Sequence, residues 1–140
     1  MRLKIWLFAL GLTVVVTACS GGSSPSSSAT ATATQRPSST AELTIVSPTN
    51  GEVVKGPDVD VKVDLTGAKI VQATSTDLKP DEGHIHVSLD GQLVTMTSGT
   101  ETTIRDVAPG HHIVQVDFVA NDHGPFFPNV VAVTSFEVKG

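Results

Sequence analysis

The sequence has 140 residues, a formal net charge of −5 and a single cysteine. A negatively charged surface repels nucleic acid and anionic lipid, so neither is expected as a partner of the folded part. One cysteine excludes a disulfide within the chain, and this length leaves room for one domain of about a hundred residues after a leader and a linker.

The amino terminus is predicted to be an export signal. Arg2 and Lys4 precede an apolar run over residues 5–16, which is the layout of a secretory signal peptide. The run is too short to span a bilayer, since a transmembrane helix needs about 20 apolar residues. Residues 1–18 are therefore expected to direct the chain out of the cytoplasm.

The apolar run ends in Val16-Thr17-Ala18-Cys19, which resembles the bacterial lipobox. At this motif a signal peptidase cuts in front of a cysteine that has received a diacylglyceryl group. The resemblance implies that acyl chains on Cys19 hold the lipoprotein on the cell membrane or an outer membrane, with its domain on the extracytoplasmic side. The alternative is an ordinary cleaved signal followed by a chance cysteine.

Residues 19–42 are predicted to form a disordered linker that starts at the lipidated cysteine. They are mostly Ser, Thr, Ala and Pro with almost no charge. Such a composition cannot bury enough apolar surface to offset the entropy lost on ordering. Residues 43–140 remain as a single domain.

The sequence of this domain predicts an all-β protein. Short runs of alternating apolar and polar residues are separated by turn residues about every ten positions. The alternation is clearest in residues 58–65, where Val59, Val61 and Val63 are separated by charged side chains. Such a strand has one buried and one exposed face. The predicted strands cover residues 43–47, 58–65, 68–73, 102–107, 112–120 and 130–138, with a hairpin over residues 83–96.

The set of strands favours an immunoglobulin-like antiparallel β-sandwich of about seven strands. Asp90-Gly91 supplies the hairpin turn, because both central positions of a type I′ turn need a positive φ. The cysteine pair and core tryptophan of true immunoglobulin domains are absent, since Trp6 is the only tryptophan and belongs to the signal. The prediction therefore concerns the architecture and leaves the strand order open.

All five histidines lie between His84 and His123. His84 and His86 alternate with the apolar Ile85 and Val87, so both imidazoles leave one outer face of a strand, roughly 7 Å apart at the backbone. The strand directions through the meander bring His123 back to the same end of the sandwich. The imidazoles of His84, His86 and His123 are therefore predicted to converge.

Three converging imidazoles would suit Zn²⁺ or Cu²⁺ better than Ca²⁺ or Mg²⁺, which prefer oxygen ligands. Cu⁺ prefers sulfur, and Met96 is the one thioether of the predicted domain. Asp81, Glu82 and Asp122 are expected near the same end, where a carboxylate could orient an imidazole or bind the ion directly. The alternative is a group of exposed histidines that hold no ligand.

His111 and His112 are expected at the opposite end of the sandwich. The strand over residues 112–120 is roughly 26 Å long, at about 3.3 Å per residue. His111 is interpreted as a solvated turn residue. His112 shares a row with Val114 and Val116 and is expected to close the core with a hydrogen bond.

Three short motifs follow one another along the domain: Gly83-His84-Ile85-His86, Pro109-Gly110-His111-His112 and Asp122-His123-Gly124-Pro125. Their order resembles an uncharacterised bacterial family of exported, histidine-rich domains of unknown function. The resemblance spans nearly the whole domain and implies a secreted β-sandwich able to bind metal, in which His84, His86, His112 and His123 match the family's histidines. The chain departs from the fuller pattern at Asn121 and Phe126, and the strand directions separate His112 from the other three.

Two functions without catalysis follow from these patterns. The first is capture of a divalent transition metal by a surface-tethered domain, and the second is a module that holds a protein or glycan of the cell envelope. Phe126 and Phe127, between two prolines, are either an exposed anchor for such a partner or plugs at the sandwich rim. An enzyme is not expected, because the chain has no nucleophile at a recognisable elbow, no phosphate-binding loop and no tyrosine.

Overall fold

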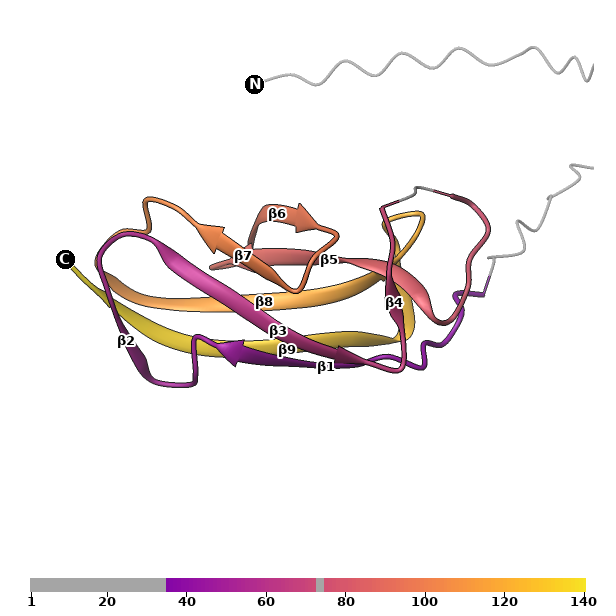
Figure 1. Ribbon diagram of the computed structural model, residues 1–140, viewed down its shortest axis with the longest axis horizontal. Helices are drawn as coiled ribbons and strands as arrows, with labels where there is room; N and C mark the ends of the chain where they lie inside the picture. The colour runs from indigo at the N-terminus through magenta and orange to yellow at the C-terminus, as the bar shows by residue number, and fades with distance from the viewer. Residues whose placement is uncertain (1–34, 73–74) are drawn as a thin grey trace, which may run out of the picture. The chain divides into compact units, whose positions relative to one another are not determined.

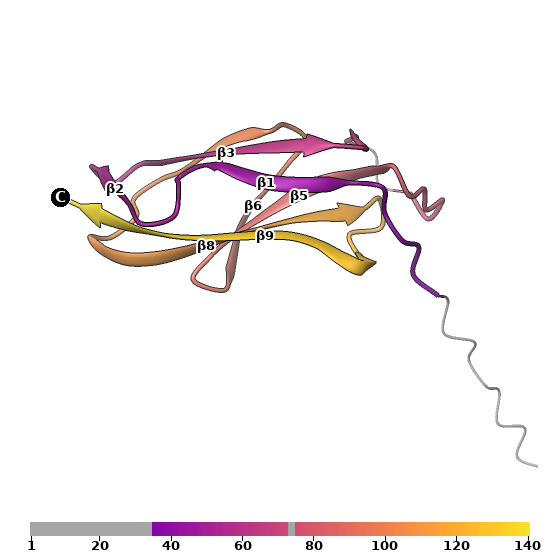
Figure 2. The ribbon, with the colours of Figure 1, turned by 90° about the horizontal axis from the view of Figure 1, so that it is seen from below.

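The computed structural model describes residues 35–72 and 75–140, and these residues form two β-sheets that face each other. Figure 1 shows the strands in chain order, and Figure 2 shows β1 and β3 in one layer with β8 and β9 in the other. The all-β prediction is confirmed, whereas Cys19 lies outside the described residues. The described strands are β1 (Glu42–Ser47), β2 (Glu52–Lys55), β3 (Val59–Thr66), β4 (Lys69–Ile70), β5 (Glu82–Leu89), β6 (Gln92–Thr97), β7 (Glu101–Ile104), β8 (Gly110–Ala120) and β9 (Pro125–Lys139).

The smaller sheet has the strand order β1-β3-β7, and the larger has the order β2-β9-β8-β5-β4, with β6 also paired to β5. The long ladders are antiparallel, as predicted. Two short edge strands depart from the prediction, because β2 pairs parallel with β9 and β4 pairs parallel with β5. Within residues 35–72 and 75–140, no helix is long and apolar enough to cross a membrane.

The core lies between the two sheets and follows the alternation of the strands. Val59, Val61 and Val63 of β3 are buried, and so are Ile85 and Val87 of β5 in the opposite sheet. Burial of such a side chain contributes about 1.5–3 kcal/mol, so these rows hold the sheets together. The positions that alternate with them on β5 point to the outer face of the larger sheet.

The chain before β1 lies against the domain, although residues 35–41 belong to the predicted linker. The guanidinium group of Arg36 donates to both carboxylate oxygens of Asp122, at 2.5 and 2.9 Å, and its Nε donates to the Pro125 carbonyl at 2.7 Å. The Phe127 N–H donates to the Pro37 carbonyl at 2.9 Å. These contacts fix the start of the described chain beside the turn between β8 and β9.

We expect Arg36→Ala to lower the free energy of unfolding by about 1 kcal/mol at pH 7, the upper range for a partly exposed ion pair. The hydrogen bond from Arg36 lowers the pKa of the Asp122 carboxyl to about 2. The ion pair therefore stabilises the fold fully above pH 3.8, the ordinary pKa of an aspartate side chain. This stabilisation is lost as the pH falls towards 2. Urea unfolding at several pH values measures it.

Arg105→Ala is the matched control, because Arg105 forms a longer and more exposed ion pair with Asp58, at 3.5 Å. We expect this variant to unfold as the parent protein does. Equal losses for the two variants would mean that the Arg36 contact has no special role.

Candidate functional site

Strand β5 positions two of the three converging histidines. Gly83 comes directly before them, and a Cβ there would lie 2.1 Å from the Val119 carbonyl oxygen. The backbone of β5 therefore lies against β8 at a distance that only glycine allows. Ile85 points into the core, so the flanking His84 and His86 both stand on the outer face of the sheet.

The third histidine comes from the turn between β8 and β9. His123 has a φ of 63°, in the left-handed region that residues other than glycine rarely adopt. Its N–H donates to the Ala120 carbonyl at 2.9 Å, and the Ala120 N–H donates to the Gly124 carbonyl at 3.0 Å. This tight turn brings the His123 ring back over the start of β5, where the sequence places it.

The three imidazoles meet through one ring nitrogen each. His84 Nε2 lies 3.1 Å from His86 Nε2 and 2.9 Å from His123 Nδ1, and the last two nitrogens are 3.4 Å apart. Each nitrogen holds either a proton or a lone pair, so at least two of the three are alike. At least one contact then sets two donors or two acceptors against each other, whereas a cation among three lone pairs removes this conflict.

The spacing of the nitrogens also matches metal coordination. Ligand nitrogens at 2.0–2.1 Å from a tetrahedral ion are about 3.3 Å from one another. The observed separations lie between 2.9 and 3.4 Å. His84, His86 and His123 are thus arranged so that they could hold a metal ion.

Burial favours the neutral form of the His84 and His86 imidazoles. Only 8% of His84 is exposed, and burial, then the nearby His123 and His86, lowers its pKa below 6.5. Burial and His123 likewise lower the pKa of His86, partly offset by Asp117. The neutral imidazole is the form that binds a metal ion.

A hollow of about 200 Å³ adjoins the three histidines. His84 and His123 line it together with residues at the end of β6 and directly after it, and with the segment after β4. These neighbours are Val71, Gln72, Met96, Thr97 and Ser98. An ion at the histidines would therefore have room for a further ligand.

The acids around the site are arranged differently from the sequence-based expectation. Asp122 pairs with Arg36 and Glu82 pairs with Lys79, so both carboxylates are engaged by cations. The carboxylate beside His86 is Asp117, its direct partner across the β5–β8 ladder. The sequence reasoning missed Asp117 because finding it requires the register of the two strands.

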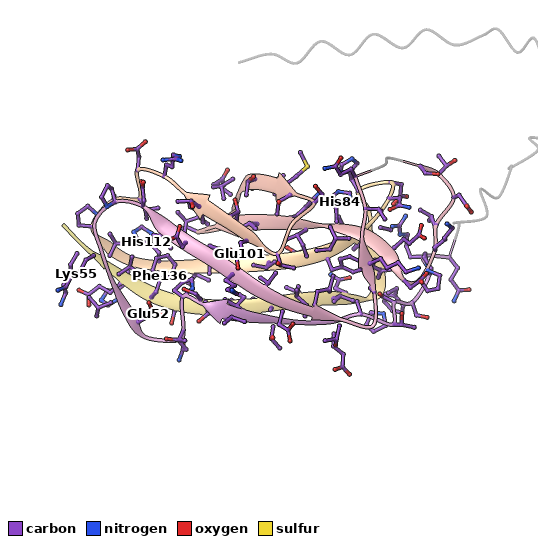
Figure 3. All side chains as sticks on the ribbon, in the orientation of Figure 1. Glu52, Lys55, His84, Glu101, His112 and Phe136 are labelled. Atoms are coloured by element: carbon purple, nitrogen blue, oxygen red, sulfur yellow. The ribbon has the colours of Figure 1, made fainter. Side chains whose placement is uncertain are left out.

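His112 lies apart from the three histidines, as the strand directions predict, and Figure 3 shows His84 and His112 in opposite halves of the domain. Its Nδ1 lies 2.7 Å from an Asp90 carboxylate oxygen, and its Nε2 lies 2.8 Å from the Ala108 carbonyl. Both partners are acceptors, so both ring nitrogens donate. The ring packs beside the buried Phe136, and the expected hydrogen bond at this end of the core is confirmed.

We expect this contact to make stability depend on pH. The hydrogen bond to Asp90 raises the pKa of His112 above 6.5, so its contribution is complete below pH 6.5 and is lost as the pH rises through the raised value. Asp90→Asn keeps a residue that tolerates the positive φ of this turn, 51°, and removes the charge. The loss should be about 1 kcal/mol at pH 5.5 and smaller at pH 8.5.

Urea unfolding of both proteins at the two pH values measures the difference. Subtracting the variant from the parent cancels the opposite contribution of His84 and His86, whose lowered pKa values cost stability in acid. The same loss at both pH values would show that His112 is not charged in the folded protein.

The two adjacent phenylalanines have different environments. Phe126 is buried and stacks on Phe118, with ring centroids 5.5 Å apart. Phe127 is 71% exposed. One ring is therefore a core plug, and the other is available to a partner.

Comparisons with known proteins identify the fold alone. No family model matches the chain, and no curated protein matches it. The fibronectin(III)-like modules of Clostridium thermocellum CbhA superpose with a TM-score of 0.52 at 19% identity, covering 69% of this chain and 94% of theirs. The PKD domain of human KIAA0319 gives a TM-score of 0.45 at 13% identity, covering 87% of this chain and 92% of that domain. The architecture is an immunoglobulin-like β-sandwich, as the strand pattern predicts.

Proposed function

We propose that this domain binds a divalent or monovalent transition metal ion through His84, His86 and His123. The observation that supports the proposal best is the triangle of three ring nitrogens, each within 3.4 Å of the other two. Protons alone cannot satisfy all three contacts, whereas an ion of zinc or copper can. Imidazole ligands favour these ions over Ca²⁺ and Mg²⁺.

The position of the site favours capture of an ion over a structural role. His84 and His86 stand on the outer face of the larger sheet, whereas Ile85 and Val87, which alternate with them, pack between the sheets. The core therefore does not depend on the ion. His123 is exposed and the site adjoins a hollow, so an ion there could be loaded and released without unfolding the domain.

Calorimetric titration of the mature chain with Zn²⁺, and titration with Cu⁺ in the absence of oxygen, test the proposal. Cys19→Ser prevents lipidation and keeps the protein in solution. One ion per chain is expected, with an affinity that depends on the three histidines, and the absence of binding by both zinc and copper would overturn the proposal.

The proposed setting is the extracytoplasmic side of a bacterial membrane, with Cys19 as the lipid anchor. The support is the apolar signal followed by the resemblance to a lipobox. We expect cells that express the full chain to incorporate a labelled fatty acid into it and Cys19→Ser to abolish the label. Because Cys19 is the only cysteine, retention of the label in the variant would rule out a thioether-linked anchor.

The second candidate is an interaction module that holds an envelope protein or glycan without catalysis. Phe127 favours it, since a 71% exposed phenylalanine is a suitable interface anchor. Phe126 is buried and cannot contribute to such a surface. This candidate therefore depends on one aromatic ring, whereas metal binding has three side chains already assembled.

A further inference from the structure

A sulfur atom belongs to the surroundings of the three histidines. Met96 on β6 is the direct cross-strand partner of His86 on β5. Directly opposed residues of an antiparallel pair have Cβ atoms about 4.5–5.5 Å apart, and their side chains leave the same face. Met96 also lines the hollow that His84 and His123 line. Two independent features thus place its side chain beside the site.

The Met96 side chain is largely exposed and is not part of the core. The residue is 55% exposed, although burial of an apolar side chain is normally favourable. Three rotatable bonds separate the methionine backbone from its terminal methyl group, so the sulfur can turn towards a neighbour across the strand. An exposed methionine beside three imidazoles is better explained by a ligand role than by packing.

We propose that the site takes Cu⁺, with the Met96 thioether as the fourth ligand beside the three imidazoles. This inference rests on the proposed function, since it requires that the histidines bind an ion. Thioether ligands select Cu⁺, and imidazole suits both copper and zinc. Met96 is therefore the residue that separates the two metals.

The test compares Cu⁺ and Zn²⁺ binding to the mature Cys19→Ser chain and to the same chain with Met96→Leu. Leucine conserves the volume and removes only the sulfur. Cu⁺ is titrated without oxygen against a colorimetric Cu⁺ chelator, and Zn²⁺ against a zinc indicator. We expect Met96→Leu to weaken Cu⁺ binding at least about tenfold, or 1.4 kcal/mol, and to leave Zn²⁺ binding unchanged.

A second variant separates ligation from general effects of methionine. Leu93 lies on the same strand opposite Ser88 and is also exposed. Adding Leu93→Met to Met96→Leu restores the composition of the strand but puts the sulfur opposite a different residue. We expect Cu⁺ binding to remain weak in this double variant.

The outcomes distinguish the two levels of the proposal. If neither metal binds the parent chain, the proposed function is wrong. If both bind and Met96→Leu changes neither affinity, or weakens both equally, the histidine site stands and the assignment of Met96 is overturned. Recovery of Cu⁺ affinity in the double variant would also overturn it.

Discussion

Replacing any one of the three histidines is expected to reduce Zn²⁺ affinity at least about 100-fold, since even loss of a residue that only orients a ligand costs up to that factor. His86→Ala removes the ligand in the middle of β5. His123→Asn is the sharper variant, because asparagine adopts the left-handed φ of 63° that this turn requires. The backbone is then conserved while the imidazole is lost. Calorimetry of each variant against the parent measures the effect.

His111→Ala is the matched control for both changes. His111 is an exposed histidine on β8, far from the site, so the substitution also removes one imidazole from the surface. We expect its Zn²⁺ affinity to equal that of the parent. Similar affinities for all three variants would place the ion elsewhere on the chain.

Gly83→Ala should lower the free energy of unfolding by about 2–3 kcal/mol, as overpacking in a core does. The new methyl carbon would lie 2.1 Å from the Val119 carbonyl oxygen and 2.8 Å from Cζ of Phe118. The first of these is backbone within a paired ladder and cannot move aside. In a domain of this size the loss corresponds to a fall in Tm of about 10–15 °C.

The same substitution should weaken metal binding, because relief of the clash moves β5 away from β8 and takes His84 with it. Gly99→Ala is the control, since its Cβ would have no neighbour closer than 3.6 Å, and we expect an unchanged Tm. Thermal unfolding followed by circular dichroism compares the three proteins. A Gly83→Ala protein as stable as the parent would contradict the close approach of β5 to β8.

The strand pattern predicts those elements whose two faces differ most. Residues 58–65 correspond closely to β3, because they alternate strictly between apolar and polar side chains. The hairpin over residues 83–96 corresponds to β5 and β6, because the Asp-Gly turn identifies it. The antiparallel return of β8 then brings His123 to His84. Convergence of the three histidines therefore follows from strand directions together with the pairing of β5 and β8, which an immunoglobulin-like order implies.

The prediction is wrong where the pattern is short or interrupted. Strand β2 is missed because its four residues place Val53 beside Val54 without alternation, and its parallel partner is the end of β9. Strand β9 begins at Pro125, ahead of the predicted residue 130, because prolines normally argue against a strand. The described domain consequently has nine strands.

The finer features of the site depend on information that one strand does not contain. Asp117 and Met96 are neighbours of His86 only through the registers of two different ladders. Arg36 meets Asp122 across 86 positions of sequence, and nothing in a serine-rich segment indicates such a contact. Register and long-range ion pairs are set by tertiary packing, so they cannot be read from local pattern.

The pairing of Arg36 with Asp122, next to His123, bears on where the proposed lipid anchor would act on the domain. The stretch from Cys19 to Gln35 can reach roughly 55 Å when fully extended. With the proposed lipid on Cys19, this linker would tether the end of the sandwich that carries His84, His86 and His123. The end that carries His112 would lie farther from the anchor. Under the proposed lipid attachment, His84, His86 and His123 would lie within a few nanometres of the bilayer surface.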